Sequence, residues 1–289
     1  MRIDGEQESS NVDDRRGMST GKGLAIGGGA VGIIFLIIKL LLGGSPDDSL
    51  NQQLNQQLNQ PGQTQEMSAE EKAADDEQAH FVKVVLKYTE DVWDDLFAKQ
   101  GKQYTHPTLV LFRGQVQSAC GFASAASGPF YCPGDQQLYI DLSFYQELKD
   151  RFQSPGDFAM AYVVAHEVGH HVQKLLGIAD MVERKRQQLN QEEYNKYSVM
   201  MELQADFFAG VWAHHAQEMK NILDPGDIEE ALNAANAIGD DRLQKEAQGY
   251  VVPESFTHGT SAQRVYWFKK GYQTGDMSQG DTFHDPSLQ

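Results

Sequence analysis

The sequence has few basic residues for its length and only two cysteines. Its 289 residues include 24 Lys and Arg against 41 Asp and Glu, so the formal net charge is −17 at pH 7. Nucleic acid and anionic lipid headgroups repel so acidic a chain, and we expect neither to be its ligand. Two cysteines alone do not complete a metal site. With 40% hydrophobic residues, the chain can form one globular domain with additional segments.

Only one apolar run is long enough to cross a membrane. The run from Leu24 to Leu42 is interrupted by glycines and Lys39 alone, and its 19 residues span about 28 Å, close to the hydrocarbon thickness of a bilayer. Lys39 lies within a turn of the outer end and can extend to the interface. We therefore predict one N-terminal transmembrane helix over residues 24–43, with the lipid bilayer as its partner.

The basic residues around this run predict its orientation. Arg15, Arg16 and Lys22 precede it, and no Lys or Arg follows it before Lys72. Positive residues favour the cytoplasmic side, so the N-terminus is expected in the cytoplasm and everything after residue 43 outside it. A cleaved signal peptide, with the small residues 43–45 as its cleavage site, is the alternative. The run is longer than a usual signal core and lacks Ala-x-Ala, which favours an uncleaved single-pass anchor in the inner membrane.

Composition divides the rest of the chain into segments of different kinds. Residues 1–23 are polar and rich in Gly, Ser and Asp, which predicts a disordered cytoplasmic N-terminus. Residues 44–67 contain Asn-Gln-Gln-Leu twice before Pro61, a composition typical of a low-complexity linker. Residues 68–273 are expected to form the folded domain, and residues 274–289 a flexible C-terminal tail.

The most informative feature of the sequence is His166-Glu167-Val168-Gly169-His170. Two histidines four residues apart on a helix point the same way from neighbouring turns, which suits two imidazoles binding one zinc ion. Glu167 lies beside them, close enough to act on a water at the metal. The apolar residues 158–165 precede the motif and predict a buried helix. Two ordinary surface histidines on an amphipathic helix are the alternative.

A catalytic zinc site also needs a third protein ligand. One large class of zinc enzymes uses a histidine six residues after the second one, but here that position is Leu176. The other main class uses a glutamate from a later helix, and Glu202 lies 32 residues on, sharing a helix face with Asp206. We predict that Glu202 binds the metal and that Asp206 accepts an N–H of His166 or His170. An acidic pair on a solvated helix face is the alternative.

The periodicity of apolar residues predicts an α+β fold that is mostly helical. Three β-like segments, 108–112, 115–118 and 137–142, predict a small mixed sheet before the motif helix. An edge strand in that position could receive an extended peptide by backbone hydrogen bonds. Further helices are expected over residues 68–100, 180–217, 224–248 and after Thr260-Ser261.

Cys120 and Cys132 flank a loop rich in Gly, Ala and Ser. The predicted topology places both cysteines outside the cytoplasm, where disulfides persist, so we expect them to form a disulfide. Closing a loop of this size would add roughly 3 kcal/mol by chain-entropy estimates. Two free buried thiols are the alternative.

Motifs along nearly the whole chain carry a resemblance to a known family. They are Asn11-Val12-Asp13-Asp14-Arg15-Arg16-Gly17, Gly128-Pro129-Phe130-Tyr131-Cys132-Pro133, Tyr139-Ile140-Asp141-Leu142, His166-Glu167-Val168-Gly169-His170-His171-Val172-Gln173, Glu202-x-x-Ala205-Asp206 and His258-Gly259-Thr260-Ser261-Ala262-Gln263-Arg264. In these the chain resembles the putative neutral zinc metallopeptidase family of membrane-anchored bacterial proteins. The resemblance implies a zincin-like fold with a glutamate as third ligand, and it implies no particular substrate.

His258 and Arg264 are further candidates for the catalytic site. They follow the ligand helix at a distance typical of residues that return to a zincin cleft. A cationic or N–H donor there would stabilise the oxyanion of a tetrahedral intermediate. A structural ion pair for Arg264, and a loop or capping role for His258, are the alternatives.

Together these features predict a membrane-anchored zinc metallopeptidase that acts on a peptide or protein. His166, His170 and Glu202 would bind Zn²⁺, while Glu167 would take a proton from water and pass it to the leaving amine. A non-catalytic scaffold for a partner at the membrane surface is one alternative, and a fourth protein ligand would indicate it. A hydrolase of a non-peptide amide is the other, since the same motif serves any activated carbonyl.

Overall fold

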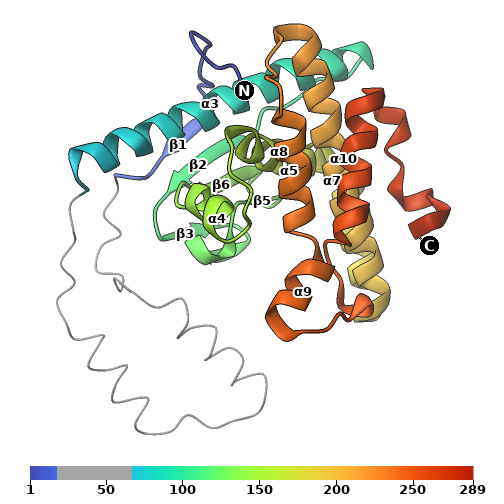
Figure 1. The fold of residues 1–289 in the computed structure, drawn as a ribbon. Helices are drawn as coiled ribbons and strands as arrows, with labels where there is room; N and C mark the ends of the chain where they lie inside the picture. The colour runs from blue at the N-terminus through green and yellow to red at the C-terminus, as the bar shows by residue number, and fades with distance from the viewer. Residues whose placement is uncertain (18–66, 289) are drawn as a thin grey trace, which may run out of the picture. The chain divides into compact units, whose positions relative to one another are not determined.

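The computed structural model describes residues 1–17 and 67–288. Residues 1–16 and 75–289 belong to one compact unit, and residues 17–74 to a second, of which residue 17 and residues 67–74 are described. Figure 1 shows the described elements of the chain. The functional candidates of the sequence all lie in the first unit, to which the following description refers.

A four-stranded mixed sheet forms one layer of this unit. Its strand order is β1 (Val12–Asp14), β2 (Thr108–Phe112), β6 (Gln137–Asp141) and β5 (Phe130–Cys132). The first three strands run parallel, while β5 is antiparallel to β6 and forms one edge. Strands β3 (Gln115–Ser118) and β4 (Gly121–Ser124) make a separate antiparallel pair.

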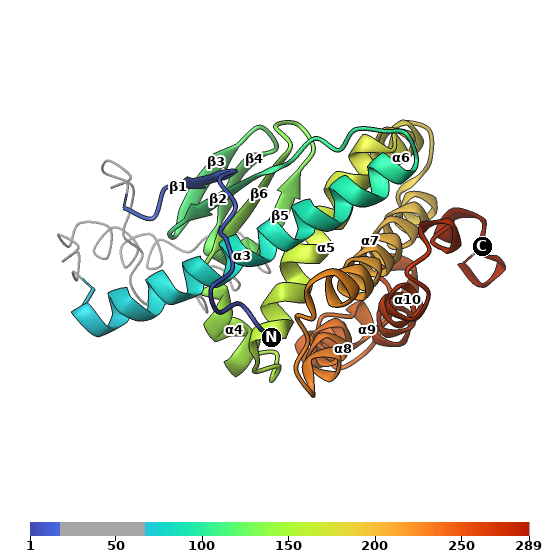
Figure 2. The same ribbon diagram turned by 90° about the horizontal axis from the view of Figure 1, so that it is seen from above.

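Helices pack beside the sheet and supply most of the core. They are α3 (Ala69–Lys99), α4 (Phe144–Asp150), α5 (Asp157–Leu175), α6 (Ile178–Arg186), α7 (Gln191–Lys220), α8 (Asp227–Ala237), α9 (Asp240–Gln248) and α10 (Ser261–Thr274). Residues 158–165 of α5 are all apolar and all buried, since α6, α7, α8 and β5 contact this helix. Figure 2 shows these helices gathered to one side of the sheet, with α3 running past both.

Three glycines let helices approach more closely than other residues would allow. A Cβ on Gly169 of α5 would lie 3.0 Å from the carbonyl oxygen of Ala205 on α7. A Cβ on Gly210 of α7 would lie 2.1 Å from the carbonyl oxygen of Phe268, and one on Gly271 of α10 would lie 2.0 Å from that of Phe207. The α5–α7 and α7–α10 contacts are therefore contacts of backbone on backbone.

The predicted α+β class, mostly helical with a small mixed sheet before the motif helix, is confirmed. Two expected helices are each interrupted. The 180–217 segment divides because the Asn190 side chain accepts the N–H of Glu193 and starts a new helix. The 224–248 segment divides at Gly239, where a Cβ would lie 2.4 Å from the backbone nitrogen of Ser261.

The N-terminal residues 1–17 are part of the fold, so the predicted disorder of residues 1–23 is wrong for them. Strand β1 pairs with β2, from Val12 beside Leu109 to Asp14 beside Leu111. The buried carboxylate of Glu90 accepts hydrogen bonds from the Ser9 hydroxyl at 2.5 Å and the Asn11 amide at 2.8 Å. The polar composition of this segment does not predict its order, because its polar side chains form hydrogen bonds with buried groups far along the chain.

The C-terminal residues also pack on the unit, so the flexible tail expected over residues 274–289 is wrong for residues 274–288. The buried Thr282 hydroxyl donates to the Met200 carbonyl at 2.6 Å, and the Gln204 amide donates to the Gly280 carbonyl at 2.8 Å. Both contacts are with α7. The tail is therefore fixed to the helix that carries Glu202.

The predicted transmembrane helix lies outside the described residues. Within residues 1–17 and 67–288, no helix combines the length and the apolar character that crossing a bilayer requires. The candidate span 24–43 and residues 44–66 of the predicted linker belong to the undescribed part of the chain. Helix α3 begins at Ala69, close to the expected domain boundary at Ser68.

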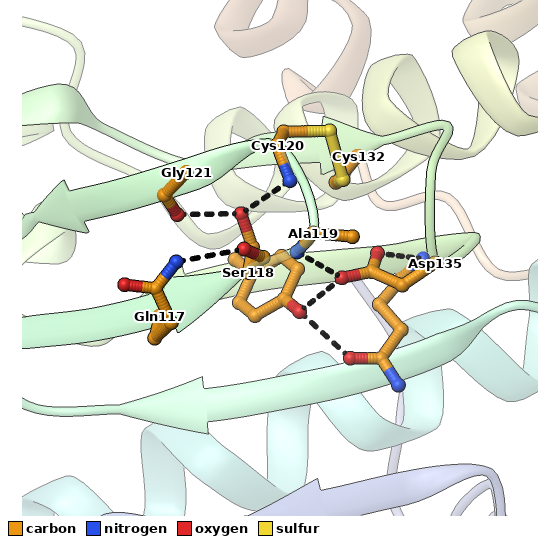
Figure 3. The surroundings of a disulfide bond; sticks show 9 residues. Gln117, Ser118, Ala119, Cys120, Gly121, Cys132 and Asp135 are labelled. Atoms are coloured by element: carbon orange, nitrogen blue, oxygen red, sulfur yellow. Dashed lines mark hydrogen bonds between the residues drawn. A yellow bond between two sulfur atoms is a disulfide. The ribbon is translucent and has the colours of Figure 1, made fainter.

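The predicted disulfide between Cys120 and Cys132 is confirmed. It joins the β3–β4 pair to the edge strand β5, as Figure 3 shows. Beside it, the Ser118 hydroxyl donates to the Gly121 carbonyl at 2.9 Å, and Asp135 accepts the Ala119 N–H at 2.9 Å. These bonds fix the segment that precedes strand β5.

Candidate metal centre

Helix α5 places His166 and His170 on one face, one turn apart. Their ring centroids lie 4.8 Å apart, and only 8% of the His166 side chain and 12% of the His170 side chain are exposed. The two rings therefore face a small, mostly dry space. This is the arrangement that the i, i+4 spacing predicts.

Helix α7 brings the carboxylate of Glu202 to the same space. Its Oε2 lies 3.2 Å from the His166 Nε2, and its Oε1 lies 3.4 Å from the His170 Nε2. One ligand atom from each of the three residues lies within 4.8 Å of the others. The close approach of α7 at Gly169 makes this possible, because Ala205 is one helical turn after Glu202.

Asp206 is hydrogen-bonded to the ring nitrogen of His166 that points away from Glu202. Its Oδ1 lies 2.9 Å from the His166 Nδ1, at the place where the sequence predicts an acceptor for a ligand histidine. The Tyr162 hydroxyl and the Arg264 guanidinium donate to the same carboxylate, which is fully buried. Burial alone would raise the pKa of Asp206, but Arg264 and His166 hold it at about 2.

Gln173 is the corresponding partner of His170, a role that was not predicted from the sequence. Its amide nitrogen donates to the Met201 carbonyl at 2.7 Å and to Gln204 at 3.1 Å, so its oxygen must be the group that faces His170. That oxygen lies 2.9 Å from the His170 Nδ1. No spacing in the sequence marks this role, and the full burial of Gln173 is seen only in the structure.

The hydrogen bonds to Asp206 and Gln173 leave His166, His170 and Glu202 arranged as metal ligands would be. With each Nδ1–H donated outward, both Nε2 atoms are directed at the Glu202 carboxylate. Burial alone would lower the pKa of His166, but Asp206 and Glu202 raise it to about 10, so positive charge is strongly favoured between His166 and Glu202. Two imidazoles and one carboxylate are a zinc donor set, and a cation supplies that charge.

Glu167 lies beside this cluster and is positioned by strand β5. The backbone N–H of Tyr131 donates to the Glu167 carboxylate. Burial raises the pKa of Glu167, and the charge of Glu202 adds to this, against the opposing effects of both histidines and the Tyr131 N–H. A carboxylate with a raised pKa accepts and releases protons more readily near neutral pH.

His171 follows the motif but belongs to another network. Its Nδ1 lies 2.9 Å from the Tyr131 hydroxyl, and its Nε2 lies 2.6 Å from the Thr105 carbonyl. Burial lowers the pKa of His171 to about 4, so the ring is neutral at physiological pH. His171 thus holds Tyr131, and with it the strand that contacts Glu167.

The structure separates the two remaining candidates, Arg264 and His258. Arg264 is buried, and its guanidinium is hydrogen-bonded to Asp206, Tyr162 and the Ile238 carbonyl. The alternative prediction for Arg264, a structural ion pair, therefore describes these contacts. It positions Asp206 behind the His166 ring.

His258 lies on the loop before α10 with half of its side chain exposed. Its Nδ1 lies 3.2 Å from Asp240, and this hydrogen bond raises the pKa of His258, as does the charge of Glu202. The next residue, Gly259, packs against Leu203 on α7. The loop that carries His258 and helix α7 are therefore neighbours.

The chain matches one protein family over almost its whole length. The model of the family described as putative neutral zinc metallopeptidase covers residues 1–283. Uncharacterized protein YpfJ of Escherichia coli K12 is 50% identical over 288 residues, which cover 98% of this chain and 99% of that protein. Uncharacterized protein Rv2575 of Mycobacterium tuberculosis H37Rv is 41% identical over 259 residues, 86% of each chain. No solved structure matches. The chain therefore belongs to the putative neutral zinc metallopeptidase family.

Proposed function

We propose that this member of the putative neutral zinc metallopeptidase family is a zinc-dependent hydrolase of peptide bonds on a zincin-like fold. The observation that carries the proposal is the convergence of His166, His170 and Glu202 on one space beside Glu167. The family match supports the same class of enzyme. Peptides or proteins are then its substrates.

In this proposal His166, His170 and Glu202 hold the metal. Zinc bound by them would act as a Lewis acid that polarises a carbonyl and lowers the pKa of water. Asp206 and Gln173 fix the two imidazoles in the tautomer that leaves each Nε2 free for the ion. Arg264 keeps Asp206 ionised and in place.

Glu167 is the general base in this proposal. Its carboxylate takes a proton from the attacking water and passes that proton to the leaving amine, so the residue ends the cycle ionised again. The Tyr131 N–H orients the carboxylate, and burial excludes competing solvent, since 9% of Glu167 is exposed.

Strand β5 is a suitable place for the substrate backbone. It forms an edge of the sheet, and its Tyr131 N–H points away from β6 towards Glu167. In an antiparallel pair both backbone groups of such a residue point to the same side, so the Tyr131 carbonyl also faces outward. An extended peptide would bind along this edge, within reach of Glu167.

His258 is the donor that we assign to the developing oxyanion. Its raised pKa favours the charged form, and Asp240 orients the ring. The half-exposed ring can approach a bound molecule without a change in the fold. Arg264 has no such access, so the role predicted for either residue falls to His258.

Replacement of Glu167 by Gln tests the mechanism. We expect hydrolysis of a dye-labelled unfolded protein to fall at least about 10²-fold, because proton transfer by a positioned group contributes 10²–10⁴-fold. The zinc content should be unchanged, since Glu167 is not a ligand. Glu192→Gln, at an exposed position in the first turn of α7, is the matched control and should retain full activity. Undiminished hydrolysis by Glu167→Gln would refute this role.

The ligand count favours an enzyme over a metal-binding scaffold. Among the described residues, His166, His170 and Glu202 form a group of three with no fourth metal-binding side chain. Three protein ligands leave a position for water or substrate, as in catalytic zinc sites. A hydrolase of non-peptide amides would use the same residues, and a substrate panel separates it from a peptidase.

We also propose that the catalytic domain functions outside the cytoplasm. The Cys120–Cys132 disulfide supports this, because such bonds persist in oxidising compartments. Attachment to the inner membrane through residues 24–43 stays a prediction, since those residues lie outside the described part of the chain. Both proposals concern location and are independent of the chemistry at the metal centre.

A further inference from the structure

A second group of metal-binding side chains lies at the C-terminal end of α7. It consists of His214, His215 and Glu218, each with one ligand atom within 4.8 Å of the others. The group is 12 residues beyond Glu202, which corresponds to roughly 18 Å along an α-helix. It is therefore separate from the catalytic centre.

Backbone carbonyls fix both imidazoles of this group. The Nδ1 of His214 lies 2.8 Å from the Tyr272 carbonyl oxygen, and the Nε2 of His215 lies 2.8 Å from that of Gly275. A carbonyl accepts only, so each of these nitrogens carries the hydrogen. When the ring is neutral, its other nitrogen then has a free lone pair.

The two free lone pairs point at one carboxylate. The Nε2 of His214 lies 3.5 Å from one oxygen of Glu218, and the Nδ1 of His215 lies 3.3 Å from the other. Within residues 1–17 and 67–288 no further donor bonds to these atoms. With both rings neutral, the two nitrogens and the carboxylate are three acceptors around one space, which a metal ion can fill.

We propose that His214, His215 and Glu218 form a second divalent-metal site, for which zinc is the best-suited ion. Two imidazoles and one carboxylate match the preferences of zinc. Metal-binding histidines usually donate their second N–H to a carbonyl or carboxylate, as both rings do here. The side chains of His214 and Glu218 are 27% and 62% exposed, so an ion can enter from solvent.

The position of the site indicates a structural role. Its outer carbonyls belong to the last turn of α10 and to Gly275, the residue at which the C-terminal segment leaves that helix. A Cβ on Gly275 would lie 2.4 Å from the His214 ring, so the turn and the ring are in direct contact. An ion here would link the C-terminal ends of α7 and α10 at the point where residues 276–288 begin.

A zinc titration of the full chain tests the site. Metal-free protein is titrated against a chromophoric chelator, and we expect two zinc equivalents for the wild type. Glu218→Ala should weaken the second equivalent at least about tenfold, since loss of an outer partner alone costs 10–100-fold in metal affinity. This side chain is largely exposed, so its removal leaves the fold intact, which circular dichroism checks.

Two control variants separate this inference from the proposed enzyme function. Glu246→Ala removes another exposed helical glutamate, paired with Arg242, and should leave both equivalents unchanged. Glu202→Ala should remove the catalytic equivalent and leave the one at His214 and His215. A single equivalent in the wild type that Glu202→Ala removes, or a second equivalent that Glu218→Ala does not weaken, would overturn the second site. Neither outcome would affect the catalytic assignment.

Discussion

Asp240 shows how one carboxylate can hold a functional loop. Its Oδ2 accepts the backbone N–H groups of Thr257 at 2.7 Å, His258 at 2.6 Å and Gly259 at 3.1 Å, while Oδ1 faces the His258 ring. Burial alone would raise the pKa of Asp240, but these donors and the charge of His258 hold it below its usual value of 3.8. The ionised form is therefore the one that the fold favours.

We expect Asp240→Asn to lose about 1.5–3 kcal/mol of unfolding free energy at pH 6, the usual range for hydrogen bonds to a charged group. A carboxylate whose pKa is lowered in the folded state stabilises the fold at pH values above its unfolded-state pKa. This contribution is lost as the pH falls through the folded-state pKa. Because the pKa of His258 is raised in the folded state, this residue stabilises the fold at pH values below 6.5. That contribution is lost as the pH rises through the folded-state pKa of His258.

The difference between wild type and Asp240→Asn should therefore be largest between about pH 4 and 6.5 and should shrink on the acid side. Urea unfolding of both proteins at several pH values measures it. Asp241→Asn is a neighbouring control, because Asp241 instead bonds to Ser261. A difference that stays constant from pH 6 to pH 3 would show that the Asp240 charge has no part in holding the loop.

At the residue scale, the sequence predicts the ligands better than their partners. His166 and His170 share a helix face by their i, i+4 spacing, and Glu202 shares one with Asp206 on a later helix by the same spacing, which is visible in a sequence. Gln173 and Asp240 act through contacts that depend on side-chain burial and on a distant loop, which spacing does not encode. Arg264 shows the same limit: its charge suggests an oxyanion donor, while its burial against Asp206 makes it a positioning residue.

At the element scale, the crossing of α7 and α10 depends on glycine. We expect Gly210→Ala to lose about 3 kcal/mol of unfolding free energy, the upper part of the usual range for overpacking. The added Cβ would meet the backbone of Phe268 and Tyr272, which cannot rotate away as a side chain can. Urea denaturation of the purified protein gives the value.

Gly169→Ala is the matched comparison on the α5–α7 side. Its Cβ would be 3.0 Å from Ala205, a contact that a small shift relieves, and alanine favours a helix interior by about 1 kcal/mol over glycine. We expect this variant to lose far less stability than Gly210→Ala. Equal losses in the two variants would contradict the role assigned to the backbone contact at Gly210.

The periodicity of apolar residues predicts most helices and strands, but it does not predict the two edge strands of the sheet, β1 and β5. Strands β2, β3 and β6 have the apolar or alternating patterns that identify strands. Strand β1 is only three residues long, and its sequence, Val-Asp-Asp, lacks the composition of a strand. Strand β5 is equally short. Strand β1 depends on pairing with β2, which is distant in sequence, and β5 is too short for its local pattern to identify it beside β6.

At the scale of the whole molecule, the N-terminal segment and the body form a single compact unit. A strand cannot pair with β2 across a bilayer, so we predict that residues 1–16 and residues 75–289 share one compartment. The predicted arrangement, with a cytoplasmic N-terminus and a domain outside, separates the two. The pairing of β1 with β2 favours instead an arrangement with both on the same side of any membrane.

Cysteine labelling in intact cells tests this prediction. Ser10→Cys and Gln248→Cys each place a thiol at an exposed position, one in the N-terminal segment and one at the end of α9. A membrane-impermeant maleimide should label both variants to the same extent, before and after lysis. Labelling of one variant and protection of the other in intact cells would contradict a shared compartment.

The central claim, a zinc centre at His166, His170 and Glu202, is tested most directly by zinc content per chain. The measurement belongs in the Glu218→Ala background, in which we expect the second proposed site to be weak. We predict one zinc per chain for Glu218→Ala and close to none when Glu202→Ala is added. One zinc retained without Glu202, or none with it, would contradict the assignment.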